Sequence, residues 1–367
     1  MSALLKDLYS ETFYHFLSET LTDVIPAFDG RQFITLIFCE QFAGYELKQR
    51  VSHTATVLHQ FMPAQFDRSV DLILAMVKHF EGLGVKSDSL EYLFLPEYIQ
   101  RYGINDYQSA VPAFEVITQF ISCEFAVRPF IVKYEKPMLE QMVLWADHDH
   151  NRVRRLASEG SRPRLPWAIT LASLKKNPAP LLPIFEQLKQ DECELVRRSV
   201  ANSLNDIAKD NPDFVIQFAR EHYGRNKNTD RLIKHACRTL LKKGEPNALV
   251  IFGFDSRDIT MSEFKIKDLI IRTGTELEFS FSVRNLSLLT KKLRLEYGLY
   301  YQKHNGSLSR KVFKISEREI SPNEIYSITR KQSFKVVTTR KFYPGAHQVS
   351  IIVNGREFET LNFELIE

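Results

Sequence analysis

One stretch of the chain, NRVRRLASEGSRPRLPWA from Asn151 to Ala168, carries the residues best suited to chemistry. A single acid, Glu159, stands among several arginines, and the stretch ends near an aromatic residue, Trp167. The arginines are Arg152, Arg154, Arg155, Arg162 and Arg164. A fixed carboxylate can stabilise a cationic transition state and orient a water, as in glycoside hydrolysis, and an indole ring can bind a cation. A salt bridge at a helix end is the commoner use of such an acid, and both interpretations stay open.

A second acid, Glu124, lies in the apolar segment SCEFAVRPFI. We expect this segment to be helical, which places Glu124 one turn before Arg128. The pair predicts either a buried ion pair that closes a helix contact or a second carboxylate of the same site as Glu159. The spacing alone does not separate these alternatives.

The elements that position these acids are helices that repeat. Up to about Ala248 apolar residues recur at the helical period, as in VDLILAMVKHFEGLG. Three segments, DHNRVRRLASEG, DECELVRRSVANSLND and TDRLIKHACRTLLKKG, align on Val153, Val196 and Ile233, with separations of 43 and 37 residues. These separations are near the span of a two-helix HEAT unit, and such units stack into a solenoid with a concave face. The sequence therefore predicts an all-α HEAT-like repeat solenoid.

Each aligned segment has an apolar stripe and an opposite polar stripe. We expect Val153, Val196, Ile233 and their apolar neighbours to be buried. The polar stripes are expected on the surface and consist of Arg152, Arg155, Glu159, Arg162, Arg198, Asn202, Asn205, Asp206, Arg231, His235, Arg238 and Lys242. A charged face is usually only solvated, but stacked helices would align these stripes into one track for a polyanion. The residues predicted to bind DNA here are Arg152, Arg154, Arg162, Arg164, Arg198, Asn202, Arg238 and Lys242.

From about Phe264 the apolar period changes to two. The segments FKIKDLIIR, LEFSFSV, LRLEYGLYY, RKVFKIS, SFKVVTT, HQVSIIV and REFETLNFELI alternate, and turn signals such as Asn354-Gly355 separate them. About seven short strands predict an all-β immunoglobulin-like sandwich. The segment KKGEPNALVIFGFDS predicts the joint, so we expect a multidomain chain with domains at residues 1–250 and 256–367.

The predicted sandwich carries basic groups of its own. No acid occurs between residues 324 and 357, a stretch that includes Lys335 and Arg340. A second basic group consists of Lys291, Lys292 and Arg294. Lysines on edge strands can serve only to prevent aggregation. The alternative is a second contact with DNA, for which Lys335 and Arg340 are predicted to bind the phosphate backbone.

The composition and the remaining patterns narrow the class of protein. The net charge of +4 decides little by itself, and the four cysteines lack metal or disulfide spacing. The chain has neither an apolar run long enough to span a bilayer nor a secretion signal at its start, so we expect it in the cytoplasm. We also expect a monomer. Asp147-His148-Asp149-His150 is interpreted as a helix start, where acids are favoured, and not as a metal site. No metal or cofactor is expected.

The stretch VRRLASEGSRPRLPWA, with ELKQRVSH upstream and VRRSVANSLNDIAKDNP downstream, resembles the AlkC branch of the AlkC/AlkD DNA glycosylases. The resemblance covers roughly residues 1–250, and the sandwich is similar to the immunoglobulin-like extension of one subset of AlkC proteins. It implies a solenoid that binds duplex DNA on its concave face and hydrolyses the N-glycosidic bond of cationic lesions such as 3-methyladenine and 3-methylcytosine. It also implies that the lesion stays in the duplex, whereas most glycosylases flip the base out.

Residue by residue, the resemblance implies roles for five positions. Glu124 and Glu159 match the catalytic carboxylates, and Trp167 matches the aromatic residue that lies against the lesion nucleotide. Arg155 matches a residue that supports the pocket, and Asp206 a further acid near the site. The alternative is a non-enzymatic HEAT scaffold that binds damaged DNA or a protein partner, because a fold alone does not decide function. Only the enzyme needs Glu124, Glu159 and Trp167 to converge near one point.

Overall fold

The computed structural model describes residues 4–336 and 341–367. The chain forms two compact units. The first consists of the residues up to Phe214 together with Arg225–Ala236, and the second of Val215–Gly224 together with Cys237–Glu367. Across these described ranges, no helix has both the length and the apolar character that crossing a membrane requires.

Helices occupy the chain from near its start to Ile251. The α-helices are α1 (Glu11–Val24), α2 (Gly30–Ile37), α3 (Leu47–His59), α4 (Phe66–Gly82), α5 (Phe94–Gly103), α6 (Tyr107–Phe120), α7 (Val127–Trp145), α8 (Asn151–Gly160), α9 (Ala172–Lys176), α10 (Leu182–Leu188), α11 (Glu194–Ile207), α12 (Pro212–His222), α13 (Lys227–Ala236), α14 (Arg238–Lys243) and α15 (Pro246–Ile251). Short 3-10 helices lie at Leu5–Leu8, Phe42–Gly44, Leu90–Leu93 and Ala179–Leu181.

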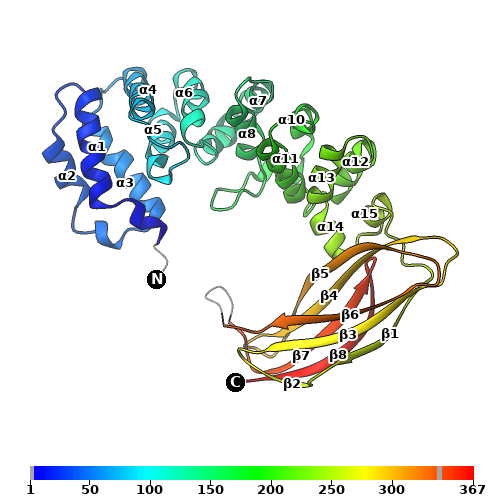
Figure 1. The fold of residues 1–367 in the computed structure, drawn as a ribbon. Helices are drawn as coiled ribbons and strands as arrows, with labels where there is room; N and C mark the ends of the chain where they lie inside the picture. Colours follow the sequence, from blue (N-terminus) through cyan, green and yellow to red (C-terminus); the bar gives the residue numbers. More distant parts are fainter. Residues whose placement is uncertain (1–3, 337–340) are drawn as a thin grey trace. The chain divides into compact units, whose positions relative to one another are not determined.

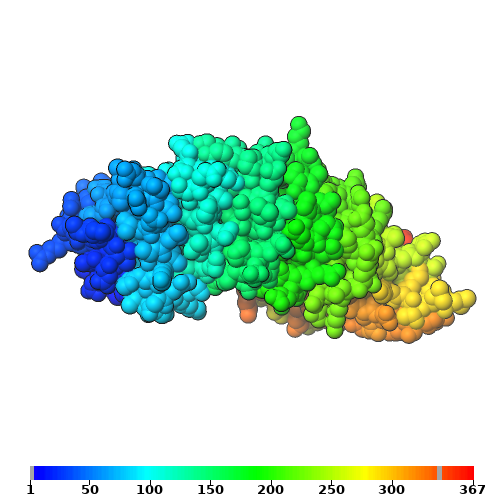
Figure 2. Space-filling view, turned by 90° about the horizontal axis from the view of Figure 1, so that it is seen from above, coloured from blue at the N-terminus to red at the C-terminus, as the bar shows by residue number. Residues whose placement is uncertain are grey.

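In the first unit the helices form two rows that follow one another in chain order (Figure 1). The row that lies on the inner side of the curve holds α3, α5, α8, α11 and α13, and the other holds α4, α6, α7 and α10. Successive layers pack together, α3 on α5, α6 on α8, α8 on α11 and α11 on α13. Figure 2 shows the same order from blue to green. The three segments aligned in the sequence begin in the neighbouring helices α8, α11 and α13, and the predicted helical repeat is confirmed. The third segment is not one helix, because it is divided at Cys237 into α13 and α14.

The expected core of these repeats is present, but part of the expected surface is not. Val153, Val196 and Ile233 are buried, as the helical period predicts. Four polar residues expected on the surface are also buried, namely Glu159, Arg162, Asn205 and Asp206. The reason is the loop after α8, because its Arg162 reaches Asp206 on α11 and so encloses both side chains. The prediction of an exposed polar stripe is wrong at these positions.

The second unit contains a β-sandwich. Its strands are β1 (Ile259–Ile266), β2 (Ile270–Arg272), β3 (Glu276–Asn285), β4 (Lys291–Gln302), β5 (Leu308–Ile320), β6 (Ile325–Ser333), β7 (Gly345–Val353) and β8 (Arg356–Ile366). One sheet has the order β1-β3-β6 and the other β2-β8-β7-β4-β5. Alternate side chains of both sheets, such as Phe281 and Leu295, form one apolar core. The predicted sandwich is confirmed, and the division of the chain at residues 250 and 256 stays a prediction.

Two predicted strands differ from the observed ones. FKIKDLIIR is not one strand, because Ile266 at its start pairs with β3 in one sheet while Ile270 pairs with β8 in the other. The prediction of a strand at SFKVVTT is wrong for residues 334–336, since β6 ends at Ser333. Ser333 pairs with Glu276, the first residue of β3, and Phe334 still exchanges backbone hydrogen bonds with Gly274 and Thr275 in the turn before β3. Residues 337–339 of that segment lie outside the described residues.

The end of the helical part is fixed to the sandwich inside the second unit. Gly244, which ends α14 with a φ of 72°, approaches Gly355 in the turn between β7 and β8 so closely that a Cβ atom would lie 2.9 Å from the Gly355 carbonyl oxygen. Asn354 of the same turn donates hydrogen bonds to the carbonyl oxygens of Asp255 and Lys292. Helix α14, the connecting segment and this turn therefore form one packed arrangement.

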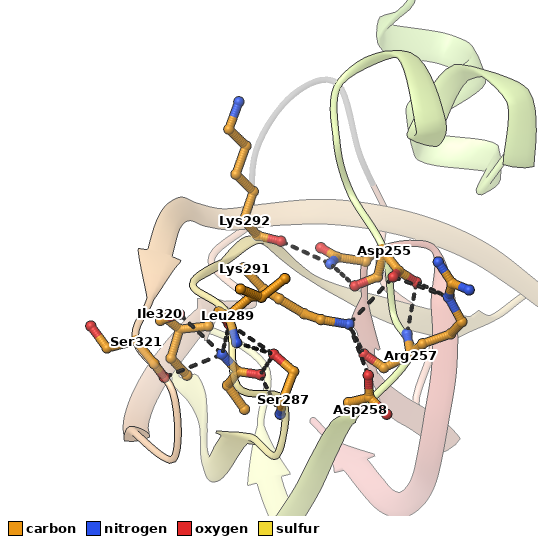
Figure 3. A network of polar contacts seen from close by, with 11 residues as sticks. Asp255, Arg257, Asp258, Ser287, Leu289, Lys291, Lys292, Ile320 and Ser321 are labelled. Carbon is orange, nitrogen blue, oxygen red and sulfur yellow. Dashed lines mark hydrogen bonds and ion pairs between the residues drawn. The ribbon is translucent and has the colours of Figure 1, made fainter.

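The second basic group of the sandwich is largely neutralised by acids (Figure 3). The Lys291 ammonium lies 3.3 Å from carboxylate oxygens of both Asp255 and Asp258, whereas the Lys292 side chain points away from them. Arg294 is buried between Glu296 and Glu317. Of the three cations in this group, Lys292 is thus the exposed one.

Candidate active site

A cleft of about 840 Å³ opens in the first unit beside the loop that connects α8 to α9. Residues of α3, α5 and α8, the turn before α7 and the loop itself line it. Much of this lining is apolar, as at Leu93, Phe125 and Leu165, and two carboxylates, Glu124 and Glu159, lie among these residues. A low-polarity lining strengthens the electrostatic interactions of such charges.

The two carboxylates of the cleft are joined by one cation. Glu124 lies in the turn between α6 and α7, and Glu159 is the penultimate residue of α8. Nη2 of Arg155 lies 2.8 Å from Oε2 of Glu124 and 3.9 Å from Oε1 of Glu159. The Ser122 hydroxyl also donates a hydrogen bond of 2.9 Å to Oε2 of Glu124. Arg155 therefore pairs with Glu124 and lies close to Glu159, and the supporting role that the resemblance implies for it stays a prediction.

A second cation, Arg162, also binds Glu159. Nη1 of Arg162 donates a hydrogen bond of 2.6 Å to Oε1 of Glu159, and its Nε donates one of 2.9 Å to Oδ2 of Asp206. Burial by itself would lower the pKa of Arg162, but Glu159 and Asp206 outweigh that effect and raise it. Asp206 also accepts a hydrogen bond from Lys209. It is buried behind Arg162 and is not among the residues that line the cleft.

Each cleft carboxylate keeps one oxygen for other partners. The contacts with Arg155 and Arg162 use Oε2 of Glu124 and Oε1 of Glu159. Within residues 4–336 and 341–367, the remaining oxygen of each group accepts no hydrogen bond. The side chain of Glu159 is 8% exposed and that of Glu124 16% exposed. The site therefore presents two held carboxylates, each with one oxygen available for a water or a cationic group.

The alternative of a Glu124–Arg128 ion pair is wrong. Arg128 is fully buried and donates its hydrogen bonds to the backbone carbonyl oxygens of Gly160, Arg162 and Ile169. Burial lowers the pKa of Arg128 to about 10, so the guanidinium remains cationic at neutral pH. Glu124 is consequently paired with Arg155 and lines the cleft, in a turn instead of the predicted helix.

Trp167 lies on the rim of the same cleft. It belongs to the loop after α8, and its side chain is 64% exposed. Its φ of 65° is in the left-handed region, which is uncommon for a residue with a side chain. Glu124, Glu159 and Trp167 thus line one cleft.

Gly160 allows the end of α8 to approach α7 closely. A Cβ atom at Gly160 would lie 2.7 Å from Cγ2 of Val127, closer than packed atoms come. Val127 begins α7 directly after the turn that carries Glu124. The glycine therefore brings the carboxylate of α8 and the carboxylate of the preceding turn to one place.

Most arginines predicted to bind DNA near the cleft are engaged by acids of the protein. Arg152 contacts Asp88 at 2.7 Å, Arg154 contacts Asp191 at 2.6 Å, and Arg164 forms two hydrogen bonds with Asp210. The hydrogen bond with Asp191 raises the pKa of Arg154, and that from Arg164 lowers the pKa of Asp210. These arginines hold the fold together, and their contact with DNA stays a prediction.

A separate basic pocket of about 270 Å³ lies between α11 and α13. It is lined by Glu194, Arg197, Arg198, Asn228, Arg231, Leu232 and His235. Arg198 and Arg231 are exposed and form no ion pair or hydrogen bond with any residue that the structure describes. Asn202 lies beside the pocket and contacts His235 at 3.0 Å. The polar stripe predicted on these two helices is therefore present here.

The remaining predicted residues lie in the second unit. Arg238 and Lys242 belong to α14, and Lys335 is exposed just after β6. Arg340 lies outside the described residues. The Asp147–His150 segment does begin a helix, because Nδ1 of His150 accepts a hydrogen bond from the Arg152 backbone and caps α8.

Sequence reasoning missed two polar residues of the site. The Ser122 hydroxyl bonds Glu124, and the Lys48 ammonium of α3 donates a hydrogen bond to the Trp167 carbonyl oxygen. Lys48 belongs to the ELKQRVSH segment that carries the resemblance, so its place in that motif was the available signal. Ser122 directly precedes Cys123-Glu124, and nothing in its spacing distinguishes it.

Comparison with known proteins places the chain in a family. Residues 104–240 match the family described as DNA alkylation repair enzyme, and residues 260–367 match the C-terminal Ig-like domain of the uncharacterised protein YhaZ. The chain is 39% identical over 362 residues to the uncharacterized protein YhaZ of Bacillus subtilis (strain 168), with 98% of this chain and 99% of that protein covered. A solved structure, Pseudomonas fluorescens alkylpurine DNA glycosylase AlkC bound to DNA containing an abasic site analog, is 32% identical, has a TM-score of 0.93 and is covered over 100% of both chains. The chain belongs to the AlkC-type DNA alkylation repair enzymes that carry a C-terminal immunoglobulin-like domain.

Proposed function

We propose that the protein is a DNA glycosylase that hydrolyses the N-glycosidic bond of cationic N-alkylated bases, 3-methyladenine and 3-methylcytosine, in duplex DNA. The observation that carries this proposal is the convergence of Glu124, Glu159 and Trp167 on one cleft. Membership of the AlkC-type family and the DNA bound to its solved relative support the same activity.

The proposed chemistry matches what two fixed carboxylates can do. An N3-methylated base already carries positive charge, so it leaves as a neutral base when it takes the electron pair of the broken glycosidic bond. Positive charge then builds on the sugar, and a nearby carboxylate stabilises it. A water adds to C1′ and loses a proton, which leaves an abasic site. We assign Glu159 mainly to stabilising the sugar cation and positioning the water, and Glu124 to holding that water.

The arrangement of cations supports this division. Arg155 and Arg162 hold Oε1 of Glu159, and Arg155 with Ser122 holds Oε2 of Glu124. Carboxylates that are already held need little reorganisation when charge develops, which is the source of electrostatic catalysis. Trp167 is exposed at the cleft rim and would contact the electron-poor base or the sugar through its π face. In the proposal, the lesion stays in the duplex while Trp167 contacts it.

For the grip on DNA, we propose that Arg198 and Arg231 bind a phosphate of the backbone. Both are exposed and line the basic pocket between α11 and α13, whereas Arg152, Arg154 and Arg164 are paired with acids. A guanidinium that binds phosphate releases counterions from DNA, which gives a salt-dependent affinity. On the sandwich, Lys335 is proposed as a further phosphate contact, because it is exposed in a stretch without acids.

The experiment that tests the activity is base release from methylated duplex DNA at equal DNA occupancy. Glu159→Gln and Glu124→Gln should each slow release by roughly 10²–10³-fold while DNA binding persists, since each loses a charge near the developing cation. Glu97→Gln is the matched control, because Glu97 lines the same cleft but is paired with Arg101 at 3.2 Å. It should release bases at nearly the wild-type rate.

Two other results would decide against the proposal. If the wild type binds DNA but releases neither 3-methyladenine nor 3-methylcytosine, the protein is a scaffold for damaged DNA. If a bulky uncharged lesion is released as fast as a cationic one, the leaving group does not supply its own charge and the assigned chemistry is wrong.

A further inference from the structure

The loop from Ser161 to Leu171 carries Trp167, yet it has little regular structure to hold it. Two backbone hydrogen bonds lie within it, from Ala168 to Leu165 at 3.3 Å and from Leu171 to Pro163 at 3.2 Å. Trp167 has a left-handed backbone conformation and an exposed ring, so neither helix geometry nor burial of the ring fixes its position. Its orientation must come from contacts made to the backbone of the loop.

The first such contact comes from a buried arginine of α7. Arg128 is 0% exposed and donates from Nη1 to the carbonyl oxygens of Gly160 at 2.9 Å and Arg162 at 2.7 Å. Its Nε donates to the carbonyl oxygen of Ile169 at 2.8 Å. One guanidinium thus joins the segment before Trp167 to the segment after it. Within the described residues, no carboxylate oxygen lies within 4.0 Å of this guanidinium, so its hydrogen bonds are used on the loop.

The second contact comes from across the cleft. Lys48 belongs to α3 and precedes Trp167 by 119 residues in the chain. Its ammonium donates a hydrogen bond to the carbonyl oxygen of Trp167 itself. The same ammonium lies 5.4 Å from the centroid of the Phe125 ring, next to Glu124. Lys48 is exposed and lines the cleft, so its aliphatic stem contributes little to the core. Its hydrogen bond fixes the peptide plane that follows Trp167.

We infer that Arg128 and Lys48 are positioning residues, which aim the Trp167 ring at the cleft by holding the carbonyl oxygens of its loop. This inference rests on the proposed function for what the ring contacts, but not for how the ring is held. Both cations act through the backbone, so neither needs to touch DNA. Removal of either should therefore affect the rate of the chemical step more than the affinity for DNA.

Tryptophan fluorescence measures the position of the ring without DNA. The chain has two tryptophans, and Trp145 is 1% exposed whereas Trp167 is 64% exposed, so acrylamide quenching reports mainly on Trp167. Lys48→Met removes the ammonium and keeps the stem. The quenching constant should change in this variant and return toward the wild-type value in Lys48→Arg. Lys136→Met, an exposed lysine on α7 outside the cleft, should leave it unchanged.

Single-turnover base release supplies the second measurement. In Lys48→Met the rate should fall roughly ten- to hundredfold, because small displacements of a positioned group cost that much. The affinity for DNA should change less than about twofold, since Lys48 binds a carbonyl and not a phosphate. In a Trp167→Phe background the same substitution should have a much smaller effect, because the ring that Lys48 positions is already altered.

The outcomes separate the two proposals. Unchanged quenching in Lys48→Met, or an equal loss of rate with and without Trp167, would overturn the positioning role. Changed quenching in a protein that releases no base would preserve it and refute the glycosylase. Arg128→Lys, which keeps the charge but not the planar donor set, should change the quenching constant too. If that buried substitution prevents folding, the exposed Lys48 variants still decide the question.

Discussion

Nη1 of Arg162 lies 2.6 Å from Oε1 of Glu159, and the same guanidinium reaches Asp206 at 2.9 Å. One buried cation therefore connects a carboxylate of the cleft to a carboxylate of the next repeat. Arg155 extends this connection from Glu159 to Glu124. The acids that the resemblance assigns to catalysis are thus held by the same ion pairs that join neighbouring helices.

The first prediction concerns the stability that Arg162 provides. Arg162→Met should lower the free energy of unfolding by about 3–5 kcal/mol, because it leaves Glu159 and Asp206 buried without their shared cation. Arg164→Met is the control from the same loop, since it breaks a more exposed pair with Asp210 and should cost less than about 1 kcal/mol. Urea unfolding measures both. Equal losses in the two variants would contradict the prediction.

The second prediction concerns the pocket between α11 and α13. If Arg198 and Arg231 bind phosphate, Arg198→Gln and Arg231→Gln should each lower the affinity for DNA and reduce the slope of log Kd against log salt by about 1. The affinity for unmodified duplexes should fall equally whatever their sequence, because the phosphate groups are the same at every base pair. A salt titration of binding makes the measurement. Lys136→Gln removes the same charge elsewhere, and a matching drop in that variant would mean that only net charge matters.

A third prediction applies to the sandwich. Lys335→Gln should weaken DNA binding and lower the salt slope, because Lys335 is exposed in the stretch without acids. Lys331→Gln should have a smaller effect, since the Lys331 ammonium lies 3.3 Å from a carboxylate oxygen of Glu278. Fluorescence anisotropy with labelled duplex DNA compares the two variants. Identical affinity for wild type and Lys335→Gln at moderate salt would remove this residue from the DNA contact.

A fourth prediction follows from the acid beside the joint. A hydrogen bond from Arg257, helped by Lys291, lowers the pKa of Asp255 to about 2 from an ordinary 3.8. A carboxylate with a depressed pKa in the folded state adds stability above its unfolded pKa, and that stability is lost as the pH falls through the folded pKa. Asp255→Asn should therefore lower Tm most near neutral pH.

The measurement is the Tm difference between wild type and Asp255→Asn at several pH values. The difference should shrink as the pH falls from about 5 to about 2, because the wild-type advantage requires the ionised carboxylate. A difference that stays constant over this range would show that Asp255 contributes through its shape or its backbone contacts, and not through its charge.

The periodicity of apolar residues was sufficient to predict the architecture, and residue chemistry was sufficient to predict part of the site. The stripes of Val153, Val196 and Ile233 identify core faces because burial follows the helical period. Glu124, Glu159 and Trp167 are chemically distinctive within apolar or arginine-rich segments, so the sequence and the resemblance single them out. The structure brings all three to one cleft.

The pairing of charges could not be predicted from the sequence. Arg154 and Asp191 lie 37 residues apart and Arg162 and Asp206 lie 44 apart, so helical spacing contains no information about them. A helical wheel likewise places Asp206 on a polar face, but it does not show that the loop after α8 covers that face. The end of β6 at Ser333 could not be predicted for a related reason, because the extent of a strand depends on the backbone partners that the fold places beside it.

The contact between Gly244 and Gly355 bears on where the sandwich could be separated from the rest of the chain. Neither residue can acquire a side chain without displacing its neighbour, so α14 and the β7–β8 turn pack as one piece. A cut between Ile251 and Ile259, where the secondary structure changes, would separate them and expose both surfaces. A piece that keeps this packing therefore has to begin upstream of α14.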